Sequence, residues 1–207
     1  MLAVALALTC GAALANWWTR VRPREWLETV SKPLTTILVI WVAIAADGPT
    51  DATVIAVFGL VLCLAGDVAL LDVVDKFIVG LAAFLLAHLA FVVMFIVLGL
   101  DRPWWGIVAG AVLAVHVATV GRRIVSGASA QEPALRIPVI AYVGTIAVMA
   151  VVAAMTGRPW AIVGAGFFVA SDSILGWRAF VHERRWMSLA VMVTYHAAIT
   201  GIALTLV

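Results

Sequence analysis

Long apolar stretches separated by short polar links run through the whole chain. A helix that spans a bilayer needs roughly 17–25 mostly apolar residues, and eight stretches reach or approach that length. They cover residues 1–18, 32–46, 52–71, 77–99, 103–120, 138–156, 159–180 and 187–206. The alternating pattern of membrane β-barrel strands is absent. The pattern therefore predicts an all-α bundle of eight transmembrane helices, forming a single domain over residues 1–207.

Composition supports a membrane location. Of the 207 residues, 65% are hydrophobic and only 12% are charged, and the mean hydropathy is +1.16. A soluble domain of this size needs far more polar surface. We therefore expect a multi-pass protein of the cell (cytoplasmic) membrane. Its basic links are too short to suggest nucleic-acid binding and are expected to contact anionic membrane lipids.

The basic residues are distributed unevenly between alternate links. Eleven of the 13 Lys and Arg residues fall in the odd-numbered links, and only Arg102 and Arg158 fall in the even-numbered ones. Cytoplasmic loops are enriched in Lys and Arg, so the odd links are predicted to face the cytoplasm and both termini to face outward. The eleven residues are Arg20, Arg22, Arg24, Lys32, Lys76, Arg122, Arg123, Arg136, Arg178, Arg184 and Arg185.

The first apolar stretch, MLAVALALTCGAALA, ends in small residues as a signal peptide does. It has no basic residue before the apolar run, however. Cleavage after Ala15 would also leave Arg20, Arg22 and Arg24 on the outer face. We therefore expect the first helix to be retained.

A shift of 105 residues reveals an internal similarity. It aligns AVFGLVLCLAGDVAL (56–70) with AIVGAGFFVASDSIL (161–175), so that Asp67 matches Asp172. The same shift aligns Pro33 with Pro138, each placed near the start of a predicted helix. The pattern predicts two parallel four-helix repeats, over residues 1–102 and 103–207.

Asp67 and Asp172 each lie inside an apolar helix, roughly 20 Å from the outer face by a rise of about 1.5 Å per residue. A charge at the bilayer centre costs about 3 kcal/mol on insertion scales, so each carboxyl needs a proton, a partner or a wet cavity. In the structural interpretation, each pairs with a neighbouring N–H group or with a basic residue such as Lys32. In the functional one, two nearby carboxyls share a proton and form a general-acid and carboxylate pair.

Other polar side chains are expected at similar depths, in the inner half of the bundle or near its middle. The outer halves of the second, third and seventh helices are almost entirely apolar. This asymmetry predicts a pocket that opens toward the cytoplasmic leaflet. The candidates for its lining are Lys32, His88, Tyr142, Ser171, Tyr195 and His196, whereas His116 is expected to be structural.

No other catalytic pattern is present. The chain has no Gly-rich phosphate loop, no nucleophile elbow and no HExxH motif. Cys10 and Cys63 are too few for a disulfide framework or a cysteine metal cluster, and no metal or cofactor is predicted. Two alternatives to an enzyme remain: a lipid or proton-coupled carrier that uses the same aspartates, and a structural partner of another membrane protein.

Several ordered motifs together resemble the YhhN family, whose animal members are lysoplasmalogenases. They are SKPLTT (31–36), GDVALL (66–71), FIVGLAAFLLAH (77–88), Tyr142 and GAGFFVASDSIL (164–175). The resemblance implies a hydrolase that cleaves the vinyl ether bond of a lysophospholipid substrate, releasing a fatty aldehyde and a glycerophospho-headgroup. Asp67 and Asp172 would then form the catalytic pair and Lys32 would contact the phosphate. His88, Tyr142 and Ser171 would orient the pair.

Overall fold

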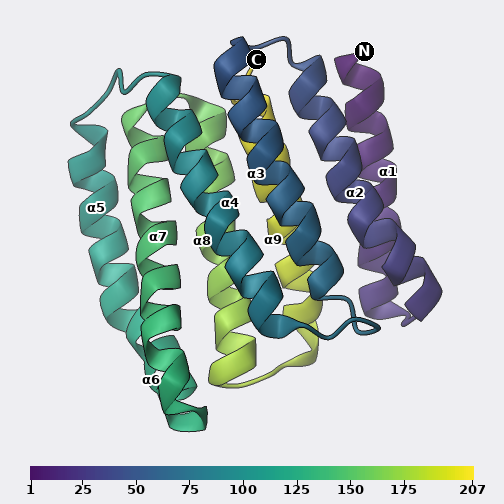
Figure 1. Cartoon of the computed structure of the whole chain (residues 1–207), viewed down its shortest axis with the longest axis vertical. Helices are drawn as coiled ribbons and strands as arrows, with labels where there is room; N and C mark the ends of the chain where they lie inside the picture. The colour runs from purple at the N-terminus through teal and green to yellow at the C-terminus, as the bar shows by residue number, and fades with distance from the viewer.

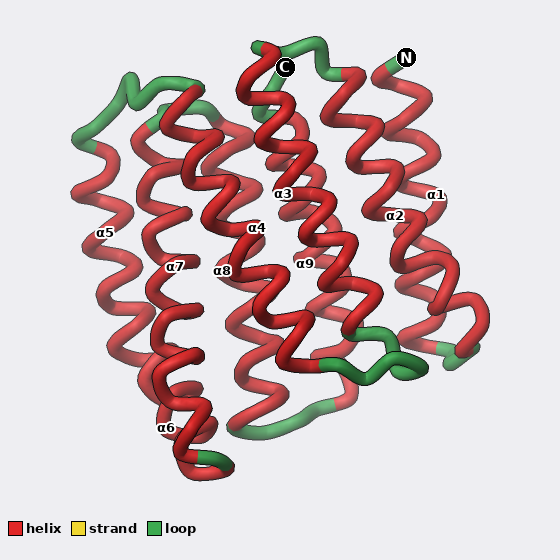
Figure 2. Tube along the Cα trace, viewed as in Figure 1, coloured by secondary structure: helices red, strands yellow, loops and turns green.

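The computed structural model describes residues 1–207 and consists of helices and loops only (Figure 2). The helices are α1 (Leu2–Val21), α2 (Glu25–Ala45), α3 (Thr50–Ala69), α4 (Phe77–Val97), α5 (Trp105–His116), α6 (Arg122–Gln131), α7 (Arg136–Met155), α8 (Pro159–Phe180) and α9 (Arg185–Leu204). A π-helical segment, η1 (Val117–Gly121), joins α5 to α6, and a short 3-10 turn, η2 (Pro133–Leu135), precedes α7. Eight helical segments are long and apolar enough to cross a membrane, which confirms the predicted number of spans.

The fifth span is longer than the sequence predicted. It runs without interruption through α5, η1 and α6, over Trp105–Gln131. The prediction ended it at residue 120 because the following stretch, RRIVSGASAQ, is polar. That stretch contains no proline, and the first helix-breaking proline after it is Pro133. The helix therefore continues to Gln131, and Arg122 and Arg123 lie in the helix rather than in a link.

The second span also begins earlier than predicted, at Glu25 instead of residue 32. Glu25 and Glu28 lie in its first turn, where carboxylates favour the positive end of the helix dipole. Hydropathy alone did not detect this turn because one of its faces is polar. Lys32 therefore lies two turns inside the helix and is 3% exposed, and Pro33 lies in the helix interior rather than near its start.

Two helical hairpins form the centre of the bundle (Figure 1). Helix α3 packs along α4, and α8 packs along α9. Helices α1 and α2 flank this centre on one side, and the α5–α6 span flanks it on the other with α7. These are the spans that the predicted repeat would pair, although the repeat itself stays a prediction.

Both termini lie at the same end of the bundle, together with the α2–α3, α4–α5 and α7–α8 links (Figure 1). The links that carry most of the basic residues lie at the other end, which we call the basic end. This arrangement agrees with the alternate sorting of the charges. That the basic end faces the cytoplasm stays a prediction.

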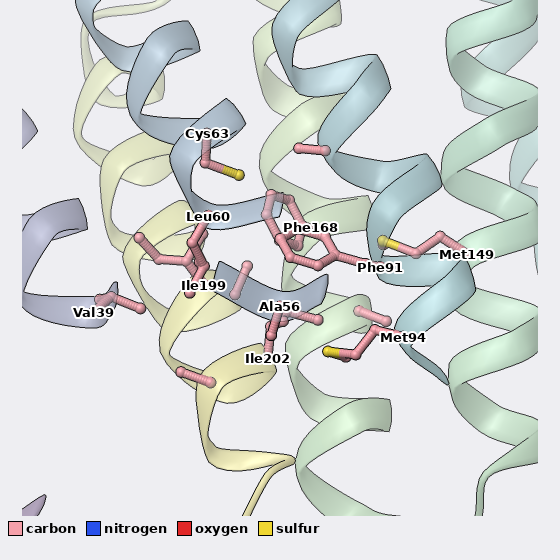
Figure 3. Close-up of a cluster of buried hydrophobic side chains, with 14 of the residues drawn as sticks. Val39, Ala56, Leu60, Cys63, Phe91, Met94, Met149, Phe168, Ile199 and Ile202 are labelled. Atoms are coloured by element: carbon pink, nitrogen blue, oxygen red, sulfur yellow. The ribbon is translucent and has the colours of Figure 1, made fainter. Parts of the chain in front are cut away.

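A continuous apolar core fills the bundle between its basic end and the end that carries the termini. Phe91 and Phe168 meet at its centre, with ring centroids 5.9 Å apart, and Leu60 and Met149 pack around them (Figure 3). All four side chains are fully buried. The core therefore separates the polar groups near the basic end from the opposite face.

Helices α8 and α9 approach most closely where Gly164 faces Gly201. A Cβ atom added to Gly201 would lie 2.8 Å from Cα of Gly164, and one added to Gly164 would lie 2.8 Å from the backbone nitrogen of Ile202. Small residues at helix crossings allow this close approach in membranes. The contact fixes α8, and with it Asp172, against α9.

Candidate active site

Asp67 lies in the last turn of α3 and is 1% exposed. Its Oδ2 atom accepts two hydrogen bonds, at 2.5 Å from Oγ1 of Thr36 and at 2.8 Å from the hydroxyl of Tyr195. The ammonium nitrogen of Lys32 lies 3.9 Å from the other carboxylate oxygen, Oδ1. Three polar groups from two other helices therefore compensate a negative charge on Asp67.

Asp172 lies in α8, two turns before the end of that helix. Its Oδ2 atom accepts a 3.1 Å hydrogen bond from the hydroxyl of Tyr142 and lies 3.3 Å from Nε2 of His88. The ion pairs of the structure include no lysine or arginine beside it. The two aspartates thus have different surroundings: Asp67 has a cation and two hydroxyls, and Asp172 has one hydroxyl and an imidazole.

Both aspartates line one cavity, of about 430 Å³, at the basic end of the bundle. Lys32, Ser171 and Tyr195 line it with them. Its mouth is strongly charged, because basic and acidic side chains from two links and three helix ends surround it. These are Arg20, Glu28, Asp72, Asp75, Lys76, Arg178 and Glu183.

Two ion pairs organise this mouth. Arg20 at the end of α1 pairs with Glu28 of α2, and Arg178 pairs with Glu183 at 2.7 Å. Nη1 of Arg20 also lies 3.5 Å from Oγ of Ser188, on α9. We call Arg20, Lys32, Lys76 and Arg178 the basic rim, since all four line the cavity.

The remaining predicted residues take different positions. His88 and Tyr142 reach Asp172 but do not line this cavity, and their rings meet edge to face with centroids 5.6 Å apart. Ser171 donates a 3.2 Å hydrogen bond to the carbonyl of Val191 and so also ties α8 to α9. His196 lies outside the lining and accepts a 3.0 Å hydrogen bond at Nδ1 from the indole of Trp17.

Sequence reasoning missed Thr36, which makes the shortest contact with Asp67. The sequence could have indicated this contact, because Thr36 follows Lys32 by four residues and so lies on the same face of the helix. The contribution of Arg20 and Arg178 to the cavity was also missed, since both were counted only as charges of the links. No cluster of three or more His, Cys, Asp or Glu side chains is arranged to hold a metal ion.

A partly polar cavity with two carboxyls and a basic rim lies at one end of a bundle of eight helices that are long and apolar enough to cross a membrane. These features define the class of protein: a polytopic membrane protein with a candidate site at one end of its helical bundle. The model of the YhhN family matches residues 27–206, and the chain belongs to this family. Two proteins named lysoplasmalogenase, from Mycobacterium bovis and Mycobacterium tuberculosis, are each 35% identical to it over 125 residues.

The matched region covers 59% of this chain and 48% of each mycobacterial protein. The chain thus spans about half the length of these relatives. No solved structure matches the chain.

Proposed function

We propose that this protein is a membrane hydrolase that cleaves the vinyl ether bond of lysoplasmalogens, releasing a fatty aldehyde and a glycerophospho-headgroup. The observation that carries this proposal is the pair of aspartates, from α3 and α8, that line one cavity at the basic end of the bundle. The name of the two mycobacterial relatives supports the substrate class.

The two carboxyls suit different roles. Asp67 accepts hydrogen bonds from Thr36 and Tyr195 and lies near the Lys32 ammonium, and all three contacts favour the ionised form. Asp172 has no lysine or arginine beside it, so it is the better candidate for the protonated acid. The division resembles that of glycosidases, in which one carboxyl donates a proton and the other stays ionised.

The reaction follows from these roles. The carboxylic acid of Asp172 delivers its proton to the β-carbon of the vinyl ether, and the α-carbon and the ether oxygen then share the positive charge of an oxocarbenium ion. The carboxylate of Asp67 stabilises this cation and accepts a proton from the water that attacks the α-carbon. The hemiacetal then collapses. Protonated Asp67 gives its proton to the glycerol oxygen as that carbon–oxygen bond breaks, and ionised Asp172 takes the proton of the hemiacetal hydroxyl, which becomes the aldehyde carbonyl. Both carboxyls return to their starting states, so the net change is the addition of one water molecule.

The basic rim suits the phosphate of the headgroup. Lys32 lies on the same helix face as Thr36 and beside Asp67. A phosphate bound by Lys32 would therefore hold the reacting vinyl ether close to Asp67. Arg20 and Arg178 stand nearer the mouth, at the ends of α1 and α8. Cationic side chains bind phosphate by charge-assisted hydrogen bonds. His88 and Tyr142 would orient Asp172, and Tyr195 would orient Asp67.

The test uses purified protein in detergent with lysoplasmenylethanolamine and measures aldehyde release by mass spectrometry. Asp67→Asn and Asp172→Asn should each abolish release, whereas Asp51→Asn, in the exposed first turn of α3, should leave it intact. Near-wild-type activity in either site variant would refute the acid and carboxylate pair. Absence of aldehyde from the wild-type protein would refute the proposal itself and favour the carrier hypothesis.

A further inference from the structure

A second opening in the protein, which we call the apolar slot, lies beside the polar cavity. Helices α4, α5, α6, α7 and α8 and the π-helical segment all contribute to it. Most of its lining is hydrophobic, including Leu113, Val117, Val143, Ala147 and Val169. Its free volume is small, about 50 Å³.

The few polar groups of the slot are already bonded to one another. Nε2 of His116 lies 2.8 Å from Oγ of Ser173, which ties α5 to α8. Tyr142 donates to Asp172. The slot therefore offers its contents a hydrocarbon surface, with Asp172 as the exception.

The slot and the polar cavity adjoin each other. Phe77, Asp172 and Leu175 line both of them. Asp172 thus stands at the junction, with the charged basic rim on one side and the hydrophobic lining of the slot on the other.

We propose that the apolar slot binds the single hydrocarbon chain of the lysolipid, beginning at its first carbons. This inference rests on the proposed function, because the vinyl ether is the bond that joins the chain to the glycerophospho-headgroup. With the headgroup in the polar cavity and the chain in the slot, that bond lies at the junction beside Asp172. The lysolipid is amphipathic, and transferring its hydrocarbon chain from water to the apolar slot is favourable. The chain therefore enters the slot while the headgroup stays in the polar cavity, and this fixes the orientation of the substrate.

The narrow slot also explains selection of a lipid with one chain. Its walls are closely spaced where small residues face bulky ones: a Cβ atom on Gly176 would lie 3.0 Å from Cγ2 of Ile124, and one on Gly121 would lie 3.2 Å from Cγ1 of Val143. A two-chain phospholipid with its headgroup in the cavity would have to leave its second chain among charged residues.

The local backbone supports a binding role for this region. Val117 and Gly121, in the π-helical segment, line the slot, and π-helical turns within α-helices are frequent at functional sites. Helix α5 contains no buried residue. Helix α5 is therefore the wall of the slot with the fewest packed side chains to displace as the rest of the chain enters.

The experiment fills the slot and varies the chain. Ala147→Phe places an aromatic ring in the slot, and Ala141→Phe, at an exposed position of the same helix, is the matched control. Each methylene that the ring displaces should weaken binding by roughly a factor of four. We expect Ala147→Phe to raise KM for a hexadecenyl lysolipid by about tenfold or more, with a much smaller change for a butenyl homologue.

A second measurement does not depend on turnover. An alkyl-ether lysolipid with a diazirine in the chain is photolysed with each protein, and labelled peptides are mapped by mass spectrometry. Label on slot residues of α5, α7 and α8 is expected in the wild type and in Ala141→Phe, and its loss is expected in Ala147→Phe. A two-chain phospholipid with the same diazirine should label only lipid-facing residues.

The outcomes separate the two proposals. Wild-type protein that releases no aldehyde but labels in the slot would refute the proposed function and support the slot. Aldehyde release with label confined to lipid-facing residues would refute the slot alone. Equal labelling by the two-chain lipid, or equal KM changes for both chain lengths, would also overturn the inference.

Discussion

The hydroxyl of Tyr195 donates a 2.8 Å hydrogen bond to Oδ2 of Asp67, joining α9 to the end of α3. The two residues are 128 positions apart in the chain. Thr36 donates to the same oxygen, so three helices converge on one carboxylate. This convergence holds Asp67 in a fixed orientation at the wall of the polar cavity, which is the condition for a carboxylate that stabilises a developing cation.

Loss of the Tyr195 hydroxyl should lower the rate of the chemical step. Tyr195→Phe keeps the ring, which packs edge to face against Phe84 with centroids 5.6 Å apart, and removes only the donor. We expect kcat for aldehyde release to fall by about 10- to 100-fold, since one such hydrogen bond contributes about 1–3 kcal/mol. Steady-state kinetics checks this value. An unchanged kcat would remove Tyr195 from the site.

Thr36 and Thr35 form a natural pair of test and control. Thr36 donates to Asp67, whereas its neighbour Thr35 donates at 2.8 Å to the carbonyl of Ser31 in its own helix. Both are fully buried, so Thr→Val is the same change in each. We expect Thr36→Val to lower kcat by about tenfold or more and Thr35→Val to leave it within about twofold. Equal effects would mean that the substitution acts through packing instead.

Substitutions at Lys32 and Asp67 should partly cancel in their effect on Tm, whereas no second substitution should restore the activity lost with Asp67. Removing one charge of a buried pair leaves the other uncompensated, at a cost of about 3–5 kcal/mol. Lys32→Met alone should therefore lower Tm in detergent, and adding Asp67→Asn should restore much of it. Aldehyde release should be absent from the double variant. If the double variant is no more stable than Lys32→Met, the 3.9 Å contact contributes no pairing energy.

The contact of Gly164 with α9 should be intolerant of a methyl group. Gly164→Ala should destabilise the protein by about 1–3 kcal/mol, because a Cβ atom there would overlap the backbone of Ile202. Gly166, two residues along the same helix, has nothing within 4 Å of its Cβ position, so Gly166→Ala should leave Tm unchanged or raise it slightly. Thermal unfolding in one detergent compares the two. A similar Tm for both variants would contradict the close packing.

The orientation of the bundle can be tested with a membrane-impermeant maleimide on intact cells. Both substitutions are made in a background with Cys10→Ala and Cys63→Ala. Asp101→Cys lies in the α4–α5 link and His182→Cys in the α8–α9 link, and these links lie at the end that carries the termini and at the basic end, respectively (Figure 1). We expect the first to be labelled directly and the second only after permeabilisation. The reverse pattern would place the polar cavity at the outer leaflet.

The sequence by itself determined the membrane frame. Hydropathy and the distribution of Lys and Arg are sums over local residues, and the bilayer acts on each helix separately, so eight spans and their alternation could be predicted without tertiary contacts. The unusual cost of Asp67 and Asp172 in apolar helices was also visible, because it depends only on what surrounds them in the chain.

Only the tertiary structure decided which groups meet. The early start of α2 buries Lys32 beside Asp67, and the packing of α4 and α7 brings His88 and Tyr142 to Asp172. These contacts join residues from different helices, and hydropathy carries no information on how helices rotate and pack. The junction of the polar cavity with the apolar slot arises from the same packing. Helices α4 to α8 and the π-helical segment must assemble to form the slot, and α1, α2, α3, α4, α8 and α9 must assemble to form the polar cavity.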